Sequence, residues 1–196
     1  MRNLLQQYFN IAFLMGKPQD LPAGRAQMKI GLAMALVSYV MAAAVPFGVE
    51  RAFLQAVVDV GSTGVVLWIA LSIVGHPGRF EQAFGGMCGA SAFINLAALP
   101  LFALRPDFGE SVMVTSTVAD FVLLVWGLSL MAHVIRHTFE VKMFVSVVMS
   151  VAFFIMLSTL VATLWPMPEL AVDPDVVSSL IGGACLPASP CTPVGG

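Results

Sequence analysis

The feature that most constrains this chain is a series of five long apolar stretches separated by short polar turns. A helix needs roughly 20 mostly apolar residues to cross the hydrocarbon of a bilayer, and each stretch has about that length. Lipid cannot satisfy free backbone groups, and the stretches show no alternation of apolar and polar residues, so each is predicted to be a membrane helix. The predicted spans are residues 30–48, 52–74, 82–104, 112–134 and 143–165.

The composition agrees with an all-α, polytopic membrane bundle. Of the 196 residues, 59% are hydrophobic and only 10% are charged, whereas soluble domains contain about 25% charged residues. The net charge of −2 indicates no basic surface for nucleic acid. The predicted organisation is a cytoplasmic segment of residues 1–29, a five-helix transmembrane domain of residues 30–165, and an extracytoplasmic tail of residues 166–196.

The distribution of Lys and Arg predicts how the chain threads the membrane. With the N-terminus in the cytoplasm, only Arg51 and Arg105 face outside. Cytoplasmic loops carry the excess of basic residues in membrane proteins, so a cytoplasmic N-terminus and an extracytoplasmic C-terminus are predicted. The opposite orientation would place seven basic residues outside and only two in the cytoplasm. The seven basic residues on the cytoplasmic side are Arg2, Lys17, Arg25, Lys29, Arg79, Arg136 and Lys142.

The segment before the first span is predicted to be a short amphipathic helix followed by a linker. Its apolar residues recur at helical spacing, which is typical of a helix lying in the membrane interface; a frayed tail is the alternative. The segment lacks the apolar run and the small-residue cleavage site of a signal peptide. The apolar residues are Leu4, Leu5, Tyr8, Phe9, Ala12 and Phe13.

The three cysteines indicate no redox or zinc chemistry, because no C-x-x-C is present. Cys88 falls in a predicted span and is interpreted as a small packing residue. Cys185 and Cys191 lie in the tail, which is rich in Pro, Gly and Ser and predicted to be flexible. An oxidising compartment would allow these two to form a small disulfide loop.

Two carboxylates, Asp59 and Asp120, fall inside predicted spans. An intramembrane carboxylate is costly, so it usually faces the bundle interior and marks a functional site. At 1.5 Å per residue both lie roughly 10–12 Å below the outer boundary, in a layer that also holds Asn95, Tyr39 and Thr117. This layer is a candidate site for a proton or a cation. Alternatively, the carboxyls only fix helix packing through hydrogen bonds, or Asp59 lies in the interface because its helix begins later.

The third span opens with small residues in a G-x-x-x-G pattern. Gly85 and Gly89 form the pattern and Ala92 continues the stripe. Small residues let helix backbones approach closely. The stripe is either a dimer face or an internal packing face of one bundle, and the internal role is favoured because the motif alone is common.

Near the end of the fourth span, His133 and His137 stand four residues apart, with Arg136 between them. That spacing can hold a metal, but no Cys or acidic partner completes a set. The three are therefore interpreted as a basic cluster that touches anionic headgroups. We find no P-loop, H-E-x-x-H, G-x-S-x-G or dinucleotide fingerprint, and we expect neither an enzyme nor a cofactor.

Several segments together resemble the bacterial form of the Yip1 superfamily. They are YFNIAFLMGKPQDLP at residues 8–22, GHPGRFEQAF at residues 75–84 before a Gly/Ala-rich helix that ends in Ala-Leu-Pro at residues 98–100, and Val-Trp-Gly at residues 125–127 before a His/Arg turn. The resemblance covers most of residues 1–165, excludes the tail, and implies five helices with a cytoplasmic N-terminus.

The resemblance implies a fold more than an activity, since it defines no catalytic residues. Together with the composition, it predicts a non-enzymatic protein of a bacterial inner membrane that scaffolds, assembles or organises membrane. Its partners would be the lipid bilayer and other membrane proteins or further copies of itself. The alternative is a small proton- or cation-coupled transporter, or an accessory subunit of a larger membrane complex, that uses Asp59 and Asp120.

Overall fold

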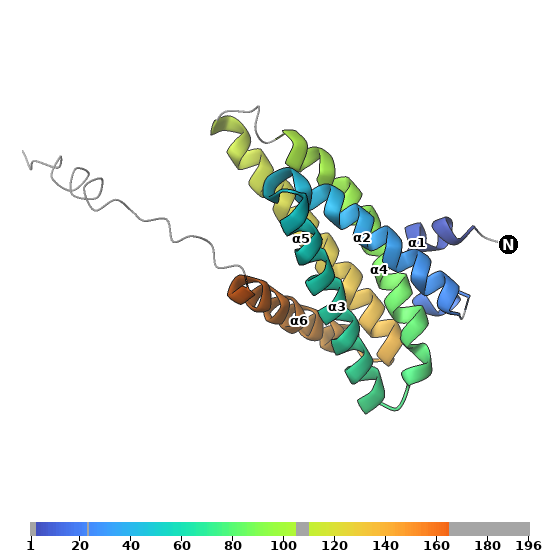
Figure 1. Cartoon of the computed structure of the whole chain (residues 1–196). Coiled ribbons are helices and arrows are strands. Elements are labelled where there is room, and N and C mark those ends of the chain that lie inside the picture. The colour runs from blue at the N-terminus through green and yellow to red at the C-terminus, as the bar shows by residue number, and fades with distance from the viewer. Residues whose placement is uncertain (1–2, 23, 105–109, 165–196) are drawn as a thin grey trace, which may run out of the picture. The chain divides into compact units, whose positions relative to one another are not determined.

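The computed structural model of the chain describes residues 3–22, 24–104 and 110–164, and the described part is helical (Figure 1). The chain divides into two units, residues 1–161 and 162–196. Of the second unit, the structure describes the last three residues of a helix, 162–164. Five helices are long and apolar enough to cross a membrane. The predicted fold class is thereby confirmed.

Eight helical elements follow one another along the described residues. They are α1 (Leu4–Ala12), the short 3-10 helix η1 (Pro18–Asp20), α2 (Arg25–Phe47), α3 (Val49–Ile73), the short 3-10 helix η2 (Pro77–Arg79), α4 (Phe80–Leu104), α5 (Glu110–Phe139) and α6 (Met143–Leu164).

Most of the long helices extend beyond the predicted spans. α2 begins at Arg25 rather than residue 30, and α5 continues to Phe139 rather than residue 134. α3 begins at Val49, so Gly48 alone separates it from α2. Hydropathy marks where the hydrocarbon ends, whereas helical hydrogen bonding continues into the polar layer. The charged residues at these ends therefore lie on helices rather than in loops.

We call the two ends of the bundle the leader end, where α2 and α4 begin, and the Gly48 end, where α2 ends and α3 begins. α2 and α4 form an extended contact. Their backbones come closest at Gly31 and Gly85. A Cβ at Gly31 would overlap the carbonyl oxygen of Gly85, and a Cβ at Gly85 would lie 2.8 Å from Cα of Met28. The glycines therefore let the two backbones approach to contact.

The leader, which we define as residues 3–22, packs against this helix pair. α1 lies beside α4 (Figure 1), and it buries Tyr8, Ile11 and Ala12. Phe9, whose ring contacts Phe93, and Phe13 just after the helix, whose ring contacts Trp126, are partly exposed. The leader therefore begins with a helix of nine residues, which ends at Ala12. Its location in a membrane interface stays a prediction.

α6 has the most apolar sequence of the five long helices, and its candidate span has a mean hydropathy of 2.4. Only 11% of that span is buried inside the protein. Ser146 and Ser150 are among its few buried residues, and the hydroxyl of Ser150 donates to the carbonyl oxygen of Leu128 on α5 at 3.0 Å. The remaining apolar side chains are available to lipid.

Candidate functional site

Two places in the described residues gather polar groups: the junction between the leader and the bundle, and a pair of hollows inside the helices. Tyr8 is the centre of the junction. Its ring packs against Gly89, where a Cβ would overlap the ring atoms. Its hydroxyl donates to the carbonyl oxygen of Gln27 at 2.6 Å. Burial is the main cause that raises the pKa of Tyr8 to about 12.

The amide of Gln27 connects Tyr8 with α4. Its Oε1 lies 3.2 Å from the Tyr8 hydroxyl, and its Nε2 donates to the carbonyl oxygen of Glu81 at 2.7 Å. The Gln27 side chain is buried, so each amide group needs such a partner. This side chain therefore ties together α1, the start of α2 and the start of α4.

The irregular part of the leader is held through its backbone. Beyond Ala12 the chain leaves helical geometry, so its carbonyl groups need other donors. Nε1 of Trp126 donates to the oxygen of Ala12 at 2.8 Å, and Nε2 of Gln82 donates to the oxygen of Leu21 at 2.9 Å. Nε2 of His133 lies 2.8 Å from the oxygen of Gly16. Donors from α4 and α5 thus fix the path of the leader.

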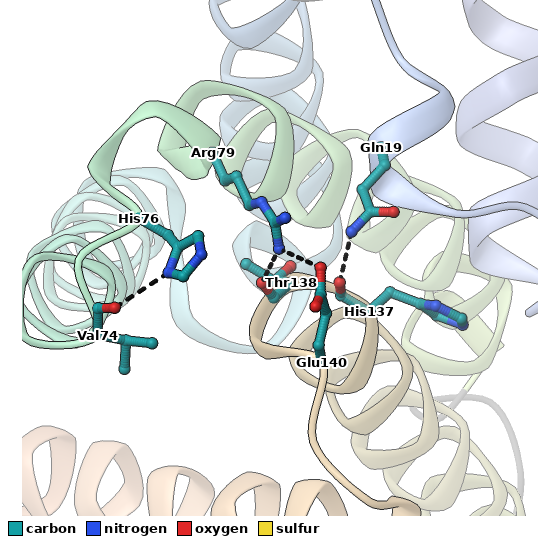
Figure 2. A network of polar contacts seen from close by, with 7 residues as sticks. All are labelled: Gln19, Val74, His76, Arg79, His137, Thr138 and Glu140. Atoms are coloured by element: carbon teal, nitrogen blue, oxygen red, sulfur yellow. Dashed lines mark hydrogen bonds and ion pairs between the residues drawn. The ribbon is translucent and has the colours of Figure 1, made fainter.

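The end of α5 is satisfied by side chains from two other segments (Figure 2). Gln19 donates from Nε2 to the carbonyl oxygen of His137 at 2.7 Å, and Nη1 of Arg79 donates to that of Thr138 at 3.2 Å. The same Arg79 nitrogen lies 2.8 Å from Oε1 of Glu140. The final carbonyl groups of a helix lack intrahelical partners and carry partial negative charge, which these two donors offset.

Three segments that are distant in the sequence, residues 8–22, 75–84 and 125–127, meet at this junction. Residues 8–22 contact residues 75–84 through the bond from Gln82 to Leu21. Residues 8–22 also contact residues 125–127 through the bond from Trp126 to Ala12.

The first hollow lies between α3, α4, α5 and α6 and has a volume of about 350 Å³. Its walls are mostly apolar, with Asp59 and Asn95 among the polar residues. Within the described residues, no hydrogen bond or ion pair reaches the carboxylate of Asp59. The polar lining residues are Asp59, Thr63, Cys88, Ser91 and Asn95.

The second hollow adjoins the first and has a volume of about 440 Å³. It is lined by Tyr39 and Asp120 and extends to Pro46, Phe47 and Phe102 toward the Gly48 end. Asn95 lines both hollows. Its Nδ2 donates to the hydroxyl of Ser38 at 3.3 Å, which leaves its carbonyl oxygen available as an acceptor.

The residues of the polar layer predicted from the sequence line two adjoining hollows rather than one, although Tyr39 lies within electrostatic range of Asp59. Asp59 lines the first hollow, Tyr39 and Asp120 line the second, and Asn95 stands at their boundary. Thr117 is exposed on α5 and belongs to the lining of neither hollow. Sequence depth alone could place these residues in one layer, but it could not show which helix faces meet.

The glycine stripe lies inside the bundle. Gly85 contacts α2, Gly89 contacts Tyr8, and Ala92 is buried. The described residues contain no cluster of three or more His, Cys, Asp or Glu side chains that could hold a metal. The rings of His133 and His137 contact each other, with centroids 4.5 Å apart. The pair Cys185 and Cys191 lies outside the described residues.

The junction donors are the site residues that sequence reasoning missed. Gln19, Gln82 and Trp126 each bond to a segment more than 60 positions away, and a lone glutamine carries no pattern that reveals such a partner. The only available signal was the glycine-rich start of the third span, which predicts a close approach without naming what approaches.

No protein-family model matches the chain, and neither the curated proteins nor the solved structures include a match.

Proposed function

We propose that this chain is a non-enzymatic membrane protein that binds a proton or a small monovalent cation at Asp59. The observation that supports this most is the position of Asp59 in an apolar-walled hollow with no ion pair among the described residues. A lone carboxylate away from water is costly unless it takes up a proton or pairs with a cation. The hollow provides the space for either.

Oxygen atoms next to Asp59 suit such a ligand. The hydroxyl groups of Thr63 and Ser91 and the carbonyl oxygen of Asn95 belong to residues that line the same hollow. Small cations prefer oxygen ligands, and hydroxyl groups also stabilise a carboxylate between protonation events. A single carboxylate with neutral oxygens suits a charge of +1 better than a divalent metal.

The second hollow provides an approach from the Gly48 end. Asp120 and Tyr39 lie along its wall, and Asn95 connects it with the hollow of Asp59. Toward the leader end the next hollow is almost entirely apolar; its lining includes Val66, Leu67 and Met131. Polar groups therefore favour movement of a positive charge between Asp59 and the Gly48 end. In this proposal Asp59 is the binding residue and Asp120 is a relay.

The test is transport or leak in vesicles that contain the purified protein. A pH-sensitive dye inside the vesicles reports proton movement under an imposed potential, and the measurement is repeated with Na⁺ and K⁺ gradients. We expect Asp59→Asn to reduce the flux to that of protein-free vesicles, because an amide cannot take up the proton or balance a cation. Asp120→Asn should slow the flux without abolishing it.

The matched control is Glu50→Gln, which removes an exposed carboxylate in the first turn of α3, outside both hollows. Its flux should equal that of the wild type. Wild-type flux no larger than that of empty vesicles, or equal flux in Asp59→Asn and wild type, would contradict the proposal.

We place the protein in a bacterial inner membrane with a cytoplasmic N-terminus. This proposal is supported by the excess of Lys and Arg at the leader end and by the Yip1 resemblance. Cysteine labelling from one side of intact cells tests the orientation. In a background with Cys88, Cys185 and Cys191 replaced by Ser, a cysteine at Met15 in the leader should react with a membrane-impermeant reagent only after lysis, and a cysteine at Glu50 should react in intact cells.

A second candidate function is scaffolding or membrane organisation of the Yip1-like type, through contacts with other membrane proteins. The observation that favours it is the convergence of the three resembling segments at the leader junction. A photo-reactive residue at Met15, which is 70% exposed beside the junction, tests this candidate. One defined cross-linked partner, lost when Gly89→Leu displaces Tyr8, would support it; no adduct in native membranes would contradict it.

A further inference from the structure

The leader end carries an excess of positive charge. Its described residues include six Lys or Arg side chains and three carboxylates. Two of the carboxylates are paired: Glu81 with Arg25 at 3.4 Å, and Glu140 with Arg79 at 2.8 Å. The third, Asp20, accepts the backbone N–H of Lys17 at 3.2 Å. The four cations without an ion pair among the described residues are Lys17, Lys29, Arg136 and Lys142.

Two of these four cations gather around one place. Lys17 and Arg136 both lie within electrostatic range of His137, as does Asp20. His137 also stacks edge-on with His133. The partial negative charge at the end of α5 does not neutralise these cations, because Gln19 and Arg79 already donate to the carbonyl oxygens of His137 and Thr138 (Figure 2). Lys17 and Arg136 are exposed, so an anion can reach them.

An exposed apolar edge adjoins this cluster along the chain. Phe9, Phe13, Leu14 and Met15 are between 40% and 70% exposed, and Lys17 follows two residues later. Leu14 adopts a left-handed backbone with φ of 61°, which is unfavourable for a residue with a side chain. The turn is held because the N–H groups of Met15 and Gly16 both donate to the carbonyl oxygen of Asn10. The leader thus presents two adjacent large apolar side chains outward.

We propose that this combination is a binding site for an anionic phospholipid. The phosphate would lie at Lys17, Arg136 and His137, and the acyl chains would follow the edge formed by Phe13, Leu14 and Met15. Basic residues beside an interfacial apolar surface attract the phosphate of anionic lipids. A free phosphate would use the cations but not the apolar edge. The site is independent of the cation site proposed at Asp59.

The experiment measures lipid binding to the detergent-purified full chain by native mass spectrometry, with phosphatidylglycerol and phosphatidylcholine as probes. Because each lost cation weakens the attraction for the phosphate, Lys17→Gln with Arg136→Gln should weaken phosphatidylglycerol binding by about 30-fold. The matched control, Lys29→Gln with Lys142→Gln, removes two unpaired cations of the same end and should have little effect. Phosphatidylcholine binding should stay weak throughout.

Two further measurements separate the sources of the phosphate and guard against misfolding. Leu14→Gly with Met15→Ser removes the apolar edge and should weaken phosphatidylglycerol binding, while inorganic phosphate should compete poorly with the lipid for the wild type. Thermal unfolding in phosphatidylcholine should occur at no lower temperature in any variant than in the wild type. Equal losses in the cluster and control pairs, equal binding of the two lipids, or displacement by inorganic phosphate as effective as by lipid would overturn the proposal.

Discussion

The helix of the leader contains nine residues and α6 contains 22, yet the shorter segment is bound more closely to the bundle. Tyr8 and Ile11 of α1 are almost completely buried, and the leader exchanges hydrogen bonds with α2, α4 and α5. Most of the apolar surface of α6 is not covered by the rest of the protein. The hydroxyl of Ser150 on this helix makes one hydrogen bond to α5.

The difference shows what holds helices together in lipid. Acyl chains solvate an apolar side chain as well as another helix does, so apolar area alone gives little association. Close backbone approach and satisfied polar groups give more, because lipid provides neither. The leader meets glycines and hydrogen-bond donors, whereas α6 offers mainly large apolar side chains.

The largest effect is expected where α2 and α4 touch. In Gly31→Ala the new Cβ would overlap the carbonyl oxygen of Gly85, which belongs to the backbone and cannot rotate away. Overpacking typically costs 1–3 kcal/mol. Because the neighbour here is rigid backbone, we expect the free energy of unfolding to fall by about 3 kcal/mol. Titration with a denaturing detergent, followed by circular dichroism, measures it.

The control for this substitution is Gly61→Ala, because a Cβ at Gly61 has no neighbour within 4 Å. It should be neutral or slightly stabilising, since Ala favours helix over Gly by up to about 1 kcal/mol. Equal losses in both variants would mean that the glycines act through helix propensity and not through close packing.

The next effect concerns the proton of Tyr8. Its pKa is raised from an ordinary value near 10 to about 12, so the folded state holds this proton more tightly than the unfolded state. Stability from this group is therefore complete below pH 10 and is lost as the pH rises toward 12. The unfolding temperature should fall over that window in the wild type and by a smaller amount in Tyr8→Phe.

Fluorescence of Trp126, in a background with Trp68 and Trp165 replaced by Phe, reports the same event locally because Trp126 bonds to the leader. Tyr39→Phe is the comparison, since Tyr39 is the only other tyrosine and the variant keeps the bond of Tyr8 to Gln27. The Trp126 signal should keep its alkaline dependence in Tyr39→Phe and lose it in Tyr8→Phe; the reverse result would contradict the assignment to the junction.

The leader and α6 also show which parts of the structure could be predicted from the sequence. The long apolar stretches are local properties, so the spans and the start of α6 at residue 143 followed directly. The charged ends of α2 and α5 did not, because a helix continues past the hydrocarbon that hydropathy detects. The depth of Asp59 and Asp120 in the membrane could also be predicted. Depth places the two residues in one layer, but it does not say in which direction each side chain points around its helix axis. Which faces meet depends on contacts between distant segments.

The leader shows this limit most clearly. Spacing predicted a helix with an apolar face toward lipid, but the face with Tyr8 and Ile11 packs on α4 instead. A tyrosine suits either environment. The glycines that face Tyr8 decide between packing on protein and packing on lipid. Gly89, which contacts the Tyr8 ring, lies about 80 positions from it in the sequence. The stripe of Gly85 and Gly89 therefore predicted close packing while leaving the choice between an internal face and a dimer face open.

A smaller effect is expected at the contact between α5 and α6. Ser150→Ala removes the bond to the carbonyl oxygen of Leu128 and leaves the packing almost unchanged. Interhelical hydrogen bonds in membranes average about 0.6 kcal/mol, so the free energy of unfolding should fall by about that much. Ser129→Ala is the control because its hydroxyl bonds within its own helix, to Val125. A loss above about 2 kcal/mol at Ser150 would show that α6 is held as firmly as the leader.

The smallest effect is expected on the open face of α6. Phe144 is 78% exposed, so Phe144→Ala exchanges one lipid-facing apolar side chain for a smaller one and should change the free energy of unfolding by less than about 0.5 kcal/mol. Phe84→Ala is the contrasting variant, because Phe84 is 7% exposed and stacks on Phe80 with ring centroids 5.2 Å apart. Removing the Phe84 ring loses this aromatic contact, which contributes about 0.5–1.5 kcal/mol, so Phe84→Ala should lose more stability than Phe144→Ala. A marked loss from Phe144→Ala would mean that this face is covered by protein in the membrane, and α6 would then be bound by a neighbour rather than by lipid.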